Sequence, residues 1–141
     1  MSALIKPLQP RDPLHALYVQ RFAVPYEFPV YFTEHLFAAE NPVFRDTLLR
    51  REPQRRHRFV VFIDADVAAS FPALGHSIAG YAQLHADALE LVAAPHPVPG
   101  GEAVKNDPTL VTALQKRLVE WGVDRHAFVV GIGGGAFLDL I

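Results

Sequence analysis

The sequence has 141 residues, of which half are hydrophobic; 13 lysines and arginines face 15 aspartates and glutamates, and there is no cysteine. This length suits one domain with a sizeable core, and the apolar content excludes an intrinsically disordered chain. The net charge of −2 excludes a global basic field for nucleic acid or anionic membranes. The lack of cysteine excludes disulfides and thiolate metal sites. No apolar run approaches the roughly 18–20 residues of a membrane span, and the first residues do not resemble a signal peptide, so we expect a cytoplasmic protein.

The N-terminal part of the chain is rich in proline. Pro7, Pro10 and Pro13 predict a flexible lead-in over residues 1–14. Two β-like runs follow at residues 15–22 and 26–32, and a proline inside the second suits an edge strand or a bulge. We expect a short helix around residues 34–37 and a further helix beginning at Asn41 and Pro42.

An arginine-rich run at residues 50–58 precedes the regular part of the chain. We interpret this run as a solvated loop, with a patch for phosphate or an acidic partner as the alternative.

Strand and helix patterns alternate from residue 59 onward. The continuous apolar run at residues 59–63 is typical of a parallel strand buried on both faces, and a helix is expected over residues 67–85. A short strand at 89–93, a rigid proline-rich loop at 95–101 and a helix beginning at Asp107 and Pro108 follow. A strand at 127–132 and the first turns of a helix at 136–141 come last. The pattern predicts an α/β fold, a Rossmann-like mostly parallel sheet with flanking helices.

Two loops in this region carry acidic or charged residues beside strands or helices, where open α/β sheets bind ligands. Asp64 and Asp66 follow the first buried strand, and a carboxylate there can accept hydrogen bonds from ribose hydroxyls; alternatively, Asp66 caps the next helix. The loop at residues 99–106 joins paired glycines to Glu102 and Lys105, which could instead form an ordinary surface ion pair.

A third loop places three consecutive glycines, residues 133–135, between a strand and a helix. Glycines remove the Cβ atoms that would obstruct a diphosphate, and the N–H groups of the helix N-terminus would meet its charge. A tight turn is the alternative, and the spacing differs from the G-x-G-x-x-G fingerprint. Asp139 follows one helical turn later. The seven histidines are scattered and form no metal-binding or hydrolase pattern, so no metal site is expected in this chain.

In order and spacing, the three loops resemble the N-terminal half of the 3-dehydroquinate synthase family of sugar-phosphate cyclases, over roughly residues 15–141. The family's acidic-x-Asn cluster corresponds to residues 64–66, its Gly-Glu-x-x-Lys loop to residues 101–105, and its Gly-Gly-Gly-x-x-Gly-Asp turn to residues 133–139. Asp66 stands where the family has Asn and Leu138 where it has Gly, which indicates a divergent subgroup and leaves the substrate open.

The resemblance implies an NAD-binding domain of the dehydroquinate synthase-like fold over residues 15–141. The residues it assigns to NAD are Asp64, Asp66, Glu102, Lys105, Gly134, Gly135, Ala136 and Asp139. In such enzymes NAD transiently oxidises an alcohol, phosphate is eliminated, the carbonyl is reduced again, and an aldol step closes the ring. A divalent metal, usually zinc, polarises the oxygen at the oxidised carbon.

The family's metal ligands and substrate-phosphate residues belong to a helical second domain that matches nothing in this sequence. We therefore expect this chain to be a truncated cofactor domain without catalytic residues or a metal of its own, inactive alone, whose parent enzyme is a lyase. Its expected partners are NAD, a sugar phosphate only together with the second domain, and further copies of itself. Apolar residues at 136–141 favour such self-association, and the parent is expected to be a homodimer.

Two other functions are compatible with the same loops. Iron-type alcohol and glycerol dehydrogenases share the fold and a similar glycine turn, but they tend to continue Asp-x-Ala-Lys, whereas Asp139 is followed by Leu140 and Ile141. The Gly-Glu-x-x-Lys loop also favours the cyclase. The other alternative is a stand-alone nucleotide-binding module without catalysis.

Overall fold

The computed structural model describes residues 19–25, 27–102, 104 and 107–141. The chain divides into two units, residues 1–30 and residues 31–141. In the first unit, residues 19–25 and 27–30 contain no helix or strand. The strands predicted at 15–22 and 26–32 are therefore wrong over residues 19–22 and 27–32, and their other residues lie outside the described part. Pro25 and Pro29 each remove a backbone donor, and a strand without a paired neighbour is not stable in water.

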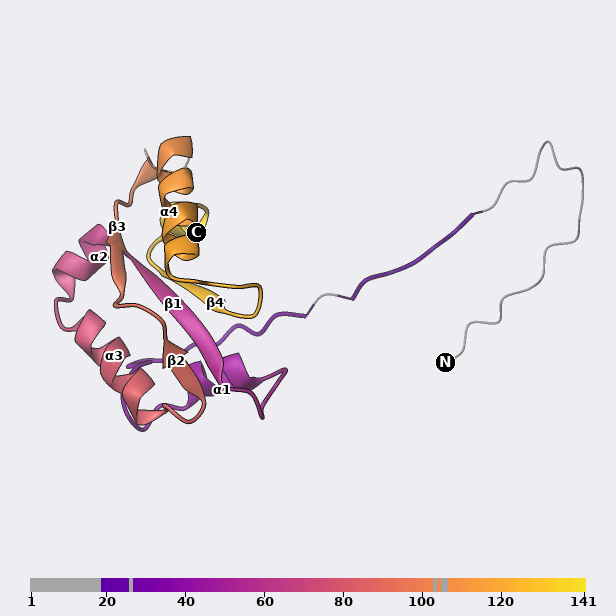
Figure 1. Ribbon diagram of the computed structural model, residues 1–141, viewed down its shortest axis with the longest axis horizontal. Coiled ribbons are helices and arrows are strands. Elements are labelled where there is room, and N and C mark those ends of the chain that lie inside the picture. Colours follow the sequence, from indigo (N-terminus) through magenta and orange to yellow (C-terminus); the bar gives the residue numbers. More distant parts are fainter. Residues whose placement is uncertain (1–18, 26, 103, 105–106) are drawn as a thin grey trace, which may run out of the picture. The chain divides into compact units, whose positions relative to one another are not determined.

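The second unit contains a four-stranded parallel sheet centred on β1 (His57–Asp64) (Figure 1). β4 (Phe128–Ile132) pairs along most of one edge of β1. β2 (Leu89–Leu91) pairs with the beginning of β1 and β3 (His96–Val98) with its end. Residues of β1 that pair with β2 or β3 also pair with β4, so β2 and β3 both lie along the edge of β1 that faces away from β4. The α/β class and the parallel sheet predicted from the sequence are confirmed.

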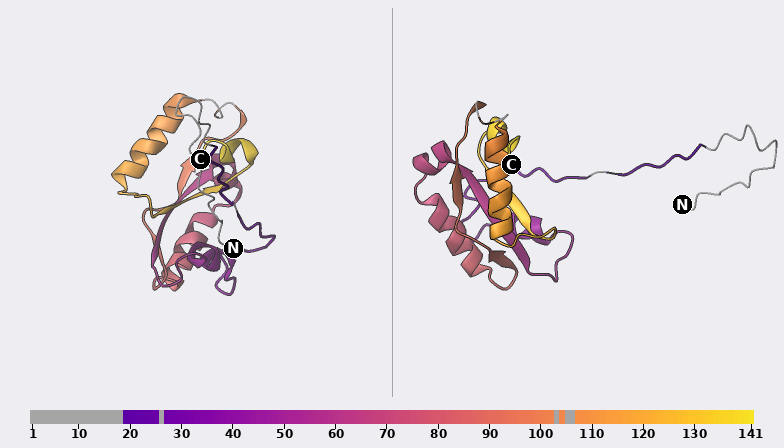
Figure 2. Two further views of the ribbon diagram at one scale, coloured as in Figure 1. Left: turned by 90° about the vertical axis from the view of Figure 1, so that its right-hand side faces the viewer. Right: turned by 45° about the horizontal axis from the view of Figure 1, so that its top comes forward.

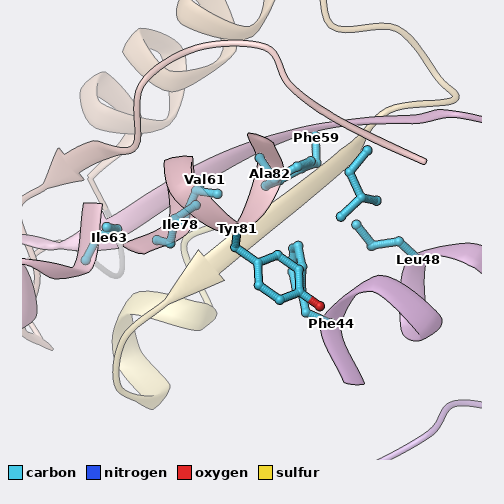
Figure 3. Packing of buried hydrophobic residues seen from close by; sticks show 9 residues of the cluster. Phe44, Leu48, Phe59, Val61, Ile63, Ile78, Tyr81 and Ala82 are labelled. Carbon is cyan, nitrogen blue, oxygen red and sulfur yellow. The ribbon is translucent and has the colours of Figure 1, made fainter. Parts of the chain in front are cut away.

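Helices cover both faces of the sheet. Alternate side chains of β1 point to opposite faces, so this strand contributes to a core on each side. Phe59, Val61 and Ile63 pack in one core with α1 (Val43–Leu49) and α3 (Leu74–Leu84) (Figure 3). Val60 and Phe62 pack in a second core with α4 (Pro108–Glu120) and α5 (Gly135–Leu138). Figure 2 shows α3 and α4 on opposite sides of β1. Burial on both faces explains the continuous apolar run that predicts this strand.

Prolines account for two differences between the expected and the observed elements. The helix expected over residues 67–85 is divided into α2 (Ala65–Ser70) and α3, because Pro72 disfavours helical backbone at Phe71, whose φ and ψ are −127° and 69°. β3 lies within the loop expected at 95–101, and the missing donor of Pro97 is tolerated because β3 pairs only with β1.

Short segments differ in length or type. Residues 34–37 form turns and bends rather than the expected helix, and α5 is a single helical turn. The helices beginning after Pro42 and Asp107 and the strands at β1, β2 and β4 lie where the sequence predicts them, within a few residues. Among the described residues, no helix is both long and apolar enough to cross a membrane.

Candidate functional site

The segments that connect the strands run over opposite faces of the sheet on the two sides of the boundary between β1 and β4. From β1 the chain passes through α2 and α3 to β2 on one face, and from β3 it passes through α4 to β4 on the other face. Ile63 and Ile132 are paired neighbours in the two strands, so the loops that follow them begin side by side. The carboxyl ends of two strands at such a switch point are where open α/β sheets bind ligands.

Asp64 is the buried polar residue at this point. Its side chain is at the end of β1 with 8% of the residue exposed, and its Oδ1 accepts a hydrogen bond of 2.9 Å from the N–H of Asp66. Asp64 therefore caps α2, and the sequence-based alternative that Asp66 is the cap is wrong. Asp66 is in the first turn of α2 and is exposed. Of the two carboxylates, Asp66 is the one that a ligand can reach more easily.

Two glycines bring the other loops against Asp64. A Cβ atom on Gly100 would overlap the Asp64 carboxylate. A Cβ atom on Gly133 would lie 2.9 Å from the Cβ of Asp64 and 2.5 Å from Cδ1 of Phe137. All three loops that the sequence singles out therefore meet at one buried carboxylate. Gly100 and Gly133 are not among the residues that the sequence analysis assigned to NAD. The consecutive glycines of both loops did indicate that something approaches the backbone closely, and at these two positions it is Asp64.

Gly134 and Gly135 have a different environment from Gly133. Both are exposed, and no protein atom lies within 4 Å of the position that a Cβ would take on either one. Their backbone thus borders open space beside the loop that packs on Asp64. Ala136 is half-buried, and Asp139 is exposed at the end of α5. Because α5 has only four residues, its dipole adds little, and an anion here would depend on close approach to backbone N–H groups.

The second loop is described only in part. Gly101 has a φ of +88°, which glycine adopts without steric cost, and Glu102 is exposed. Lys105 lies outside the described residues, and so does the alternative of a surface ion pair between Lys105 and Glu102. The N–H of Val104 donates to the carbonyl oxygen of Gly101 at 3.3 Å, which closes a turn directly after the paired glycines.

Other potential sites lie elsewhere on the second unit. A hollow of about 550 Å³ is lined by residues 35–38, residues 70–74 and Ser77, and none of the predicted NAD residues belongs to it. Within the described ranges, no group of three or more histidine, aspartate or glutamate side chains could hold a metal ion.

The three comparisons with known proteins provide no assignment. A scan against protein-family models finds no match, and neither does a search of curated proteins or of solved structures. The fold and the convergence of the three loops at Asp64 are accordingly the observations from which a function can be inferred.

Proposed function

We propose that this chain binds NAD at the carboxyl ends of β1 and β4, as the cofactor domain of a dehydroquinate synthase-like sugar-phosphate cyclase. The observation that carries the proposal is the packing of Gly100 and Gly133 against Asp64, because it brings the three motif-bearing loops to one place. The switch point of the parallel sheet supports the same location.

The environments of the loop residues suggest how the cofactor is held. The open space beside Gly134 and Gly135 suits a diphosphate, which needs backbone N–H groups without intervening side chains. Exposed Asp66 suits the ribose hydroxyls, and Asp64 acts indirectly by fixing the start of α2. In this arrangement Glu102, Lys105, Ala136 and Asp139 complete the surroundings of the cofactor, as the family resemblance implies.

Bound NAD would supply the transient oxidation and re-reduction of a substrate alcohol in the intact enzyme. The proposal assigns to this chain the binding and orientation of NAD, and it assigns the metal and the sugar phosphate to a second domain. The same cofactor site would serve an iron-type dehydrogenase, but the Gly-Glu-x-x-Lys sequence at residues 101–105 favours the cyclase.

Titration of the isotope-labelled chain with NAD, followed by NMR, tests the binding site. We expect chemical-shift changes at residues 64–66, 100–104 and 133–139, and weaker binding by Gly134→Ala. Gly80→Ala is a matched control, because Gly80 also has no protein atom near a substituted Cβ but lies on α3. A folded sample without shifts at millimolar NAD, or with shifts confined to the hollow at residues 35–38 and 70–74, would contradict the assignment. Equal affinity for ATP and NAD would favour a general nucleotide-binding module instead.

A further inference from the structure

The loops that lead into β1 and β4 meet at the end of the sheet opposite the proposed NAD site. β1 begins at His57 and β4 at Phe128, and the rings of these two residues are 5.4 Å apart between centroids. The loop before β1 contains most of the arginine-rich run at residues 50–58, and the loop before β4 contains Arg125 and His126. Parallel pairing of the two strands therefore brings together basic residues that are far apart in the sequence.

His126 contacts an arginine through each of its ring nitrogens. Nη1 of Arg55 lies 3.2 Å from Nδ1 of the ring, and Nε of Arg125 lies 3.2 Å from Nε2. A guanidinium group only donates hydrogen bonds, whereas a neutral imidazole has one acceptor nitrogen and a protonated imidazole has none. At most one of the two contacts is therefore a hydrogen bond, and at the other contact two donors face each other. These three side chains, the Arg–His cluster, have more donors than acceptors.

Two carboxylates lie next to the Arg–His cluster without supplying the missing acceptor. Oε2 of Glu52 is 3.3 Å from Nη1 of Arg55. Oδ1 of Asp124 accepts a hydrogen bond of 2.9 Å from the backbone N–H of His126, which holds the turn before β4. Among the described residues, no hydrogen bond or ion pair joins a carboxylate to the side chain of Arg125 or His126. An added group with several acceptor oxygens would satisfy these donors.

The charge around the Arg–His cluster favours an anion. Residues 50–58 contain five arginines and one glutamate, and Arg56 and Arg58 share a single carboxylate, that of Glu90, at 3.1 and 3.5 Å. Residues 1–30 carry three lysines and arginines against two carboxylates, so this segment brings no net negative charge. The complementary charge is therefore expected from a molecule other than this chain.

We propose that Arg55, Arg125 and His126 bind a phosphate group, either free phosphate or a small phosphate monoester. Such a group carries a charge of about −1.5 to −2 near neutral pH and has three acceptor oxygens, so it can contact both guanidinium groups and the ring at once. A carboxylate or a phosphodiester has only two free oxygens and one charge, and each satisfies fewer of these donors. Because this site lies at the amino ends of the strands, it does not depend on the proposed binding of NAD.

NMR titration of the full isotope-labelled chain tests the site, with inorganic phosphate and glycerol 3-phosphate as probes. We expect saturable shifts of the Nε–H signals of Arg55 and Arg125 and of the His126 ring signals at millimolar probe. The probe that binds more tightly identifies the source of the phosphate group. Dimethyl phosphate, a diester, should bind at least about tenfold more weakly, the effect of one lost hydrogen bond to a charged group.

Two glutamine variants of the same loop separate a built site from general charge attraction. Arg55→Gln should lower the affinity for phosphate about tenfold. Arg56→Gln is the matched control, because it removes the same charge, but Arg56 is paired with Glu90. Its effect should stay below about twofold, as solvent screens a paired surface charge. Equal weakening by the two variants overturns the proposal, as does the absence of saturable shifts or equal affinity for dimethyl phosphate.

A further variant tests whether the chain's own carboxylates occupy the Arg–His cluster. Asp12→Asn and Glu27→Gln together replace both carboxylates of residues 1–30. We expect the double variant to bind phosphate as the unmodified chain does. Distinctly tighter binding by the double variant would overturn the proposal, because residues 1–30 would then compete for the same donors.

Discussion

Gly133 and Gly134 are adjacent in the glycine run at residues 133–135, but their surroundings differ. Gly133 is enclosed by the Phe137 ring and by Asp64, whereas Gly134 has a φ of −79° and open space where a Cβ would be. Phe137 is fully buried in the core beneath α4, so it cannot move aside without opening that core. Gly133 is therefore needed for packing, and Gly134 is available to a ligand.

We predict that Gly133→Ala lowers the free energy of unfolding by about 1–3 kcal/mol, the usual cost of overpacking a core. Gly134→Ala should change the free energy of unfolding by less than about 0.5 kcal/mol, as exposed substitutions do. Urea denaturation of the two variants and of the unmodified chain provides the comparison. Equal stability of the two variants would mean that Gly133 is not confined as its contacts indicate.

His96 introduces a dependence of stability on pH. Its ring lies 5.8 Å from that of Trp121 and 6.1 Å from that of Phe62, between centroids. Burial lowers the pKa of His96 below its ordinary value of 6.5, and the positive charge of Arg117 lowers it further. The folded state thus disfavours the protonated ring, and the associated stability is complete above about pH 6.5 and is lost as the pH falls below it.

We predict that the unmodified chain loses stability more steeply than His96→Gln as the pH falls from about 7 to about 5. Denaturant titrations at each pH give the two curves, and other titrating groups cancel in their difference. Curves that run parallel over this range would show that protonation of His96 has no net effect on folding.

Among the helices, α4 has the clearest start signal in the sequence. Asp107 Oδ1 accepts hydrogen bonds from the N–H groups of Thr109 at 2.8 Å and Leu110 at 3.2 Å, and Pro108 takes the first helical position. We predict that Asp107→Ala lowers the free energy of unfolding by about 0.5–2 kcal/mol, the typical contribution of a side-chain cap. Asp107→Asn, which keeps an acceptor oxygen, should lose much less by chemical denaturation. A full loss in Asp107→Asn would assign the effect to charge rather than to the cap.

Elements with strong local signals could be predicted from the sequence, and those that depend on neighbouring strands could not. The apolar run of β1 and the Asp107–Pro108 signal of α4 are local, and both elements lie where they were expected. β3 contains Pro97 and exists only because the end of β1 provides a paired edge. The segment over residues 27–32 has strand-like alternation but no paired strand, and alternation alone does not form a strand.

The candidate site could likewise be predicted only in outline. The rule that ligand loops follow parallel strands identified the loops that meet at Asp64. Whether Asp64 or Asp66 caps α2 depends on where β1 ends, a boundary that no residue type marks. Gly133 and Gly134 differ because the chain turns after them and brings the Phe137 ring against Gly133 alone. A run of three glycines in the sequence does not indicate which of them will be enclosed.

At the scale of the whole molecule, β1 joins two cores that lie on opposite faces of the sheet. Ile78 of α3 is fully buried in one core, and Leu114 of α4 is buried in the other. β1 supplies side chains to both cores, so loss of either core destabilises the strand on which the other core depends. The two cores should therefore unfold together, although none of their helices is shared.

We predict that Ile78→Ala and Leu114→Ala each lower the free energy of unfolding by about 2–5 kcal/mol, the cost of a large-to-small change in a core. Each variant should still unfold in one transition, because loss of either core exposes β1. Hydrogen exchange at the amides of β1 and β4 should accelerate in each variant by the factor that its own loss of unfolding free energy implies, since these amides open only in the global transition. Faster exchange confined to α4 in Leu114→Ala, with β1 unchanged, would show instead that the α4 face opens by itself and that the sheet is stabilised mainly from the side of α1 and α3.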